Sequence, residues 1–231
     1  KQPEGRYVSS AKKLSNAEVG EVVKFGVDPT GPVGGSLLAN LIQNPSLMER
    51  VNQGREVGYI IIFVGLIGIA IAFWKLFTLY TMGVAVAKQA KSKTHDKSNP
   101  LGRVLAVGEE HMGKDTETLE LRLAEAIMAE RPAIERGIPV VKIISVVAPL
   151  AGLLGTVTGM IVTFQQITLF GTGDPKIMAG GISQALVTTV LGLVVAIPTT
   201  LLHSFANSSA RGIINVLEEQ STGIVAEHSD S

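Results

Sequence analysis

The sequence contains no cysteine and only four histidines. The lack of cysteine excludes structural disulfides and leaves the cellular compartment undecided on that ground. The histidines have no metal-ligand spacing with one another or with carboxylates. No nucleophile–base arrangement is present either, so the sequence predicts no enzyme, no metal and no cofactor. The four histidines are His95, His111, His203 and His228.

Charge is scarce and balanced: charged residues make up 17% of the chain, with 20 basic and 20 acidic side chains. A chain without net charge lacks the basic excess that nucleic-acid binding requires, so no nucleic-acid partner is expected. Hydrophobic residues make up 46% and the mean hydropathy is +0.34, which is typical of a membrane protein with polar appendages. The sequence begins at Lys1 without a signal-peptide pattern, and we expect further residues upstream of it.

Residues 143–173 and 177–210 contain no Asp, Glu, Lys or Arg, and only Asp174, Pro175 and Lys176 separate them. As a helix the first stretch would extend about 46 Å, whereas the hydrocarbon core of a bilayer is about 30 Å thick. Each stretch is therefore long enough to cross a membrane. Their close succession predicts an antiparallel transmembrane hairpin.

A further span is predicted at residues 57–80, which are free of charge from 57 to 74. Tyr59, Trp74 and Tyr80 are aromatic residues of the type found at membrane interfaces. Lys75 is expected to snorkel to the polar boundary.

Basic residues between the first and second spans set the orientation by the positive-inside rule. This rule places the N-terminus outside and the C-terminus inside. The basic residues that carry the argument are Lys75, Lys88, Lys91, Lys93, Lys97, Arg131, Arg136 and Lys142.

These features predict an all-α integral membrane protein with three transmembrane helices and cytoplasmic helical extensions. The predicted segments are an extracytoplasmic N-terminal segment (1–56), transmembrane helix 1 (57–80), a cytoplasmic helical region (81–137), transmembrane helix 2 (138–170), a periplasmic loop (171–176), transmembrane helix 3 (177–205) and a cytoplasmic tail (206–231).

Local signals predict shorter helices in the polar segments. Two are expected in the N-terminal segment, at 19–25 and, as an interfacial helix, at 37–42. A helix is expected over 100–112 and another after Asp115, which would cap it. In the second of these, Arg131 and Glu135 are placed to pair across one turn. Other expectations are an apolar stripe of Leu119, Leu123 and Ile127, a bend at Pro132 and Pro139, and a tail that frays after an amphipathic 213–217 segment.

Small and hydroxylated residues recur at helical spacing in both arms of the hairpin. Such faces let helix backbones approach closely in lipid. The alternative is that each threonine only bonds a carbonyl of its own helix. Two matching stripes favour a helix–helix interface or a polar lumen. The stripes are Ser145, Gly152, Thr156, Gly159 and Thr163 in the second span, and Ala185, Thr189, Gly192, Ala196 and Thr199 in the third.

Specific motifs in the hairpin carry a resemblance to a known family. They comprise residues 148–157 (APLAGLLGTV) with Gly159-Met160 and Thr163-Phe164, and residues 181–186 (GISQAL) with Thr188-Thr189, Gly192-Leu193 and Ala196-Ile197-Pro198. The chain resembles the ExbB/TolQ/MotA proton-channel family over about residues 57–209, and within it the TtpC-type accessory branch of TonB-type systems.

The resemblance implies a subunit of a proton-driven motor in a Gram-negative inner membrane, which energises uptake across the outer membrane. Its implied partners are further copies of the chain in a homopentamer, an ExbD-type single-span protein inside the pore, a TonB-type protein and membrane lipids. The ExbD-type partner would supply the proton-carrying aspartate. The resemblance also implies an extended extracytoplasmic part, most of which would lie upstream of Lys1.

Site residues are expected in two groups. Family members often carry a glutamate where this chain has Gln184, and an amide cannot titrate. A non-conducting structural adaptor, a flagellar-stator-like ion-motor subunit and a solute permease remain as alternatives. The expected pore-facing residues are Thr156, Thr189, Gln184, Ser145, Thr163 and Gly192, and the expected helix-packing residues are Gly152, Gly155, Gly159, Ala185, Ala196, Pro149 and Pro198.

Overall fold

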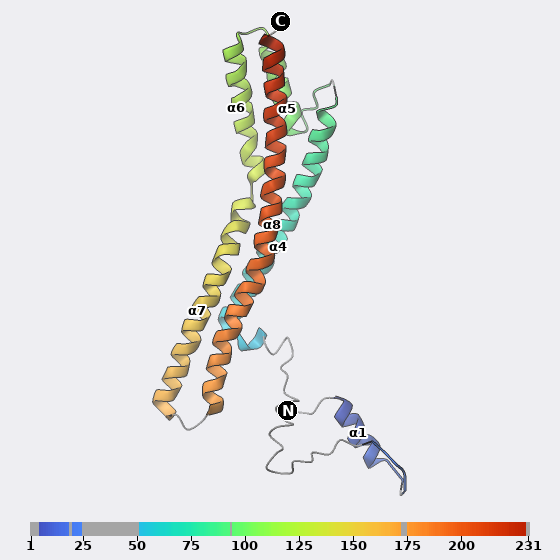
Figure 1. Cartoon of the computed structure of the whole chain (residues 1–231), viewed down its shortest axis with the longest axis vertical. Helices are drawn as coiled ribbons and strands as arrows, with labels where there is room; N and C mark the ends of the chain where they lie inside the picture. The colour runs from blue at the N-terminus through green and yellow to red at the C-terminus, as the bar shows by residue number, and fades with distance from the viewer. Residues whose placement is uncertain (1–4, 19, 25–50, 93, 172–174, 230–231) are drawn as a thin grey trace. The chain divides into compact units, whose positions relative to one another are not determined.

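The computed structural model describes residues 5–18, 20–24, 51–92, 94–171 and 175–229 (Figure 1). The chain divides into two compact units, residues 1–50 and residues 51–231. The second unit carries the long apolar helices and is the one that bears on function.

The first unit contains helix α1, Gly5–Ser15, which the sequence patterns did not predict. The helix predicted at 19–25 is wrong over residues 20–24, which are not helical. There the Glu21 amide donates to the Glu18 carbonyl at 3.1 Å, and Gly20 adopts a φ of 98°, outside the helical region. The helix predicted at 37–42 lies outside the described residues.

Three long helices dominate the second unit: α4 (Arg55–Gln89), α7 (Ile138–Phe170) and α8 (Pro175–Ser229). Each is long and apolar enough to cross a membrane, which confirms the predicted all-α fold with three candidate spans. α7 and α8 pack against each other along the hairpin, and α4 packs against both (Figure 1).

Two shorter helices, α5 (Pro100–His111) and α6 (Thr116–Glu135), confirm the pair predicted in this region. The Asn99 side chain caps α5 by accepting from the Gly102 amide at 2.8 Å. Asp115 caps α6, as predicted, by accepting from the Thr118 amide at 3.0 Å. Both caps satisfy amides that have no partner within the helix.

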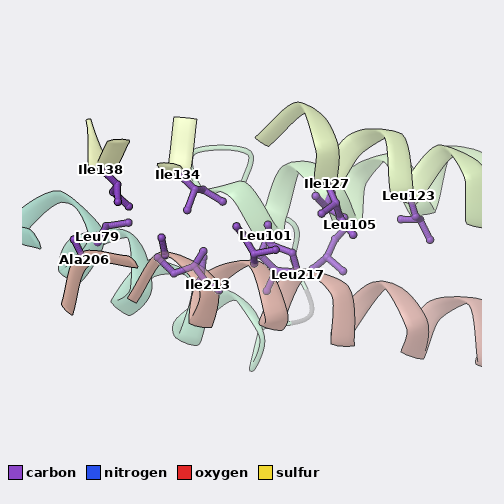
Figure 2. Close-up of a cluster of buried hydrophobic side chains, with 14 of the residues drawn as sticks. Leu79, Leu101, Leu105, Leu123, Ile127, Ile134, Ile138, Ala206, Ile213 and Leu217 are labelled. Carbon is purple, nitrogen blue, oxygen red and sulfur yellow. The ribbon is translucent and has the colours of Figure 1, made fainter. Parts of the chain in front are cut away.

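A hydrophobic core holds α5 and α6 to the ends of α4 and α8 (Figure 2). The predicted apolar stripe of α6 is confirmed, because its three residues are buried in this core. Burial of this kind removes apolar surface from water and is the main stabilising contribution to such a bundle. The core residues labelled in Figure 2 are Leu79, Leu101, Leu105, Leu123, Ile127, Ile134, Ile138, Ala206, Ile213 and Leu217.

α8 continues to Ser229, so the predicted fraying of the tail is wrong. Ala210, Ile213, Ile214 and Leu217 of α8 are buried in the core, and Ile224 and Val225, beyond the predicted 213–217 segment, pack against it. The tail therefore has an apolar face with partners on other helices, and this packing extends the helix beyond its own weak propensity.

The chain breaks between α6 and α7 at Gly137, whose φ of 88° lies in the left-handed region. A bend was predicted at Pro132 and Pro139, and the helix is interrupted between them at Gly137: Pro132 lies within α6, and Pro139 occupies the first turn of α7. Proline is tolerated in the first turn because the amide it removes has no helical partner there.

Lys75 does not snorkel to solvent as expected. Its side chain is buried, with 4% of the residue exposed, and its Nζ donates to the Ala133 carbonyl of α6 at 3.1 Å. Ala133 lies in the last turn of α6, where carbonyls lack helical partners. Lys75 thus ties the middle of α4 to the end of α6, beside the Gly137 break.

Candidate transmembrane site

The contact between α7 and α8 is built from small residues that bring the two backbones together. A Cβ on Gly192 would lie 2.7 Å from the Ala148 carbonyl oxygen, and one on Gly152 would lie 2.9 Å from the Thr188 carbonyl oxygen. A Cβ on Gly159 would lie 3.1 Å from the Cβ of Ala185. Larger side chains at these places would force the helices apart.

The structure buries several of the expected pore-facing residues within one protomer. Ser145 and Thr163 are 8% and 2% exposed, and Gly192 is buried against α7. Gly181 of α8 abuts the Thr163 side chain. This placement favours packing over a pore-facing position for Ser145, Thr163 and Gly192.

Thr156 and Thr189 are only half-buried. The Thr156 hydroxyl donates to the Leu153 carbonyl of its own helix at 2.6 Å, and the Thr163 hydroxyl donates to Gly159 at 2.9 Å. These bonds match the alternative in which each threonine satisfies a carbonyl of its own helix. The Thr189 Cα, rather than its hydroxyl, approaches the position of Gly152.

Thr188 is a central contact residue that sequence reasoning missed. It is 0% exposed, packs on Gly155 and donates its hydroxyl to the Ala185 carbonyl at 2.7 Å. Its spacing of three from Ala185 and four to Gly192 fits the small-residue face as well as that of Thr189 does. The spacing therefore indicated a threonine at the contact between α7 and α8, but it could not show which of Thr188 and Thr189 is buried there.

The two prolines within the spans lie beside this contact. Pro149 faces Gly192, whose Cβ position would lie 3.3 Å from the Pro149 Cα. The buried Thr199, next to Pro198, donates to the carbonyls of Val195 at 2.8 Å and Ala196 at 3.1 Å. Threonine hydroxyls thus bond carbonyls in the turn where proline disturbs regular helical bonding.

Gln184 lines a polar cavity of about 360 Å³ where the ends of α4, α7 and α8 meet. Asn52, Gln53, Arg55 and Gln166 share the cavity walls. Sequence reasoning missed these four residues, because they are far apart in the chain and follow no common motif.

Hydrogen bonds fix the walls of this end of the bundle. The Ser183 hydroxyl donates to Gln53 Oε1 at 3.1 Å, and the Tyr59 hydroxyl donates to Asn52 Oδ1 at 2.7 Å. An adjoining cavity of about 610 Å³ shares Gln184 and also includes Glu56.

Chemically, this arrangement can pack helices and hydrogen-bond water or a partner. Amide and hydroxyl groups donate and accept hydrogen bonds but do not titrate near neutral pH. Within the described part of the chain, no group of three or more His, Asp or Glu side chains could hold a metal ion. The helices α7 and α8 carry no Asp or Glu between residues 143 and 173 or between 177 and 210.

Comparisons with known proteins bear on these membrane helices. The matching family is described as the MotA/TolQ/ExbB proton channel family, and its match covers residues 96–219, more than half of the 231-residue chain. A protein of Methanothermobacter thermautotrophicus named as an ExbB homolog is 26% identical over 189 residues, which cover 75% of this chain and 67% of that protein.

Two further relatives are similar over shorter or comparable stretches. A Synechocystis protein named ExbB-like 1 is 29% identical over 175 residues, covering 68% of this chain and 69% of that protein. The biopolymer transport protein ExbB of Aquifex aeolicus is 48% identical over 58 residues, which cover 25% of this chain and 39% of that protein. The chain is a multi-pass membrane protein that belongs to the MotA/TolQ/ExbB proton channel family.

Proposed function

We propose that this chain is the ExbB-type subunit of an inner-membrane motor that couples proton flow to TonB-dependent transport across the outer membrane. The specific form is a TtpC-like accessory subunit, and it acts as a transport component rather than an enzyme. Family membership supports the proton-channel part of this proposal. The TonB system and the Gram-negative inner membrane rest on the resemblance of the hairpin motifs.

One observation supports assigning proton transfer to a partner subunit. The α7–α8 hairpin is tightly packed and has no carboxylate at membrane depth. A proton relay through a membrane normally needs an ionisable group inside it. The relay group must then come from another chain, and an ExbD-type single-span partner with an intramembrane aspartate would supply it.

The partner would lie inside a ring of five copies, as in the family that the hairpin resembles. Thr156, Thr189 and Gln184 are the expected pore-facing residues that one protomer leaves partly uncovered. We therefore place these three at the lumen. Thr163 and Gly192 instead hold α7 to α8, and Ser145 is buried with its hydroxyl bonded to the Lys142 carbonyl of its own helix.

The decisive experiment measures proton flux in liposomes that contain the chain together with its single-span partner. An imposed pH gradient should collapse with the complete complex and persist when the partner's aspartate is replaced by asparagine. Equal flux with and without that carboxylate would contradict the proposal. Native mass spectrometry of the same complex should show five copies of this chain.

The lumen assignment is tested by replacing Thr156 or Thr189 with valine, which keeps the shape and removes the hydroxyl. Assembly should survive, because each loss costs only about 1 kcal/mol in lipid. Coupled uptake should fall. Thr168→Val is the matched control, since Thr168 is exposed and its hydroxyl donates to the Phe164 carbonyl of its own helix at 2.9 Å. Full uptake by both lumen variants would contradict a role of Thr156 and Thr189 in coupling and would leave them with a role in helix packing only.

A second candidate function is favoured by Gln184, which stands where family members often carry a glutamate. A ring without that carboxylate would suit a structural adaptor that holds the TonB-type protein but conducts nothing. Such an adaptor would bind the same partners, and the complete complex would leave the imposed pH gradient intact.

A further inference from the structure

Two helix faces outside the charge-free spans are apolar and uncovered within one protomer. On α6, Leu121 and Met128 are 67% and 70% exposed. On α4, Tyr80 and Val84 are 72% and 54% exposed. Leu121 and Met128 are seven residues apart and therefore lie on one side of α6, facing away from its buried stripe. Tyr80 and Val84 are four residues apart on α4.

The two faces carry opposite charge. The α4 face is defined by Tyr80, Val84 and Lys88, together with Lys91 in the turn that follows the helix, and both lysines are exposed. The α6 face, defined by Glu117, Glu120, Leu121, Ala124 and Met128, begins with two exposed glutamates. Other charges flank the α6 face as pairs: Arg122 with Glu125 at 2.8 Å, and Arg131 with Glu135 at 3.6 Å.

The two faces also match in height. The Lys75–Ala133 hydrogen bond fixes a common level on α4 and α6, which run in opposite directions from it. Both helices rise about 1.5 Å per residue, so equal residue counts from that bond correspond to equal distances along the two helix axes. Three pairs on the two helices fall at the same count: Tyr80 with Met128 at five residues, Val84 with Ala124 at nine, and Lys88 with Glu120 at thirteen. Lys91 follows in the turn two residues after the end of α4, and Glu117 lies in the first turn of α6.

These matched faces do not meet within one protomer. α6 packs on α5 and α8, and α4 also packs on α5 and α8. Figure 1 shows α4 and α6 on either side of α8. The residues of both faces are exposed as a result. Each face can therefore bind the complementary face of another molecule, which the membrane holds at the same height.

We propose that the α6 face of one protomer docks on the α4 face of a second copy of this chain. The contact pairs apolar residues near the membrane and places two glutamates against two lysines farther out. Because two different surfaces meet, the contact is heterologous, and copies held with parallel axes in a membrane close into a ring. The inference rests on the proposed function for the ring, and adds which surfaces form its joints.

Cross-linking tests the joint directly, since the chain has no cysteine of its own. The Val84→Cys/Ala124→Cys double variant in membranes should give a ladder of multimers with a short bis-maleimide. Each single variant should give none, because a heterologous joint never brings two copies of one position together. A product from Ala124→Cys alone would overturn the inference.

The matched control moves one cysteine around α6. In Val84→Cys/Ala129→Cys, the second position is also exposed but lies five residues along, about 140° around the helix. This variant should give little or no ladder. An equal ladder from both double variants would show non-specific collision and contradict the proposed joint.

Charge reversal tests the outer half of the joint. Glu117→Lys/Glu120→Lys in the cross-linking background should lower the yield of multimers several-fold. Adding Lys88→Glu/Lys91→Glu should restore it, because the pairing is then present with its signs exchanged. A loss that the second reversal does not restore would contradict the charge pairing.

Copy number is read separately by native mass spectrometry of the uncross-linked protein. A pentamer without the Val84–Ala124 cross-link would overturn this inference and leave the proposed function standing. A monomer would contradict both. A pentamer with the cross-link ladder ending at five would support both.

Discussion

At the scale of single residues, the α7–α8 contact depends on glycines that leave room for a facing backbone. Gly192 is the clearest case, because the nearest atom to its Cβ position is the Ala148 carbonyl oxygen at 2.7 Å. A backbone atom in a helix cannot rotate away as a side chain can. The helices themselves must separate to accept any larger residue.

Gly192→Ala should therefore lower the free energy of unfolding in detergent by about 1–3 kcal/mol, the usual effect of overpacking. Gly212→Ala on the same helix is the control, because nothing lies within 4 Å of its Cβ position. It should be neutral or stabilise by up to about 1 kcal/mol through helix propensity. Equal stability of the two variants would contradict the close backbone contact.

Asp115 makes the cap of α6 dependent on pH. Hydrogen bonds from the Thr118 hydroxyl and amide hold the pKa of the Asp115 carboxyl below its ordinary value. A carboxyl whose pKa is depressed on folding stabilises the fold above its unfolded pKa, about 3.9, and this contribution is lost as pH falls through the folded value.

The Thr118 amide resonance should consequently titrate below about pH 3.9, the ordinary aspartate value. Asp115→Asn keeps a capping acceptor but has no proton to gain, so its Thr118 resonance should show no such step. An unchanged titration in Asp115→Asn would assign the step to another group.

At the scale of secondary-structure elements, the junction between α6 and α7 is held by a residue from a third helix. Lys75 of α4 bonds the Ala133 carbonyl beside the Gly137 break. This bond fixes the end of α6 against the membrane-spanning bundle. It also fixes where the exposed face of α6 lies relative to α4.

Lys75→Met should loosen this junction, because it removes the hydrogen bond from the buried Lys75 side chain to the Ala133 carbonyl, a loss of about 1.5–3 kcal/mol for a bond to a charged group. Amide hydrogen exchange in residues 134–141 should become faster. Lys88→Met, an exposed position on the same helix, should leave those rates unchanged. Identical exchange in both variants would mean that the bond does not hold the junction.

Much of the element order was predictable from local signals. Charge-free length predicted the spans, and the capping residue Asp115 with Leu119, Leu123 and Ile127 at helical spacing predicted α6. The tail of α8 was not predictable, because its sequence is mostly polar and the packing of Ile224 and Val225 against the core depends on other elements. Gly137 was missed because nothing in the sequence distinguishes a glycine with left-handed backbone from any other glycine.

The candidate site was less predictable for a geometric reason. Spacing shows that residues share a helical face, but the rotation of that face is set by the partner helix. Thr188 and Thr189 both fit the spacing, yet only Thr188 is buried against Gly155. Lys75 illustrates the same limit, because its partner Ala133 lies 58 residues away in the chain.

At the scale of the whole molecule, we propose the topology from the distribution of lysine and arginine around the spans. The proposed orientation places the end of the hairpin between α7 and α8 in the periplasm and the α4–α5 connection in the cytoplasm. In intact cells, Thr172→Cys should react with a membrane-impermeant maleimide and Ser98→Cys should not. The chain has no other cysteine to confuse the signal. The reverse labelling pattern would invert the orientation.

The central claim is that this chain builds the channel while a partner carries the proton. A lumen of hydroxyl, amide and aliphatic groups offers bare hydronium no titrating group, and its desolvation is strongly unfavourable. Gln184→Ala should accordingly leave the pH dependence of flux through the complete complex unchanged.

The most direct measurement is proton flux through the chain reconstituted alone, compared with the complex containing its single-span partner. The chain alone should leave an imposed pH gradient intact, and the complex should dissipate it. A rapid proton leak through the chain alone would contradict the account, because the conducting group would then have to lie in this chain.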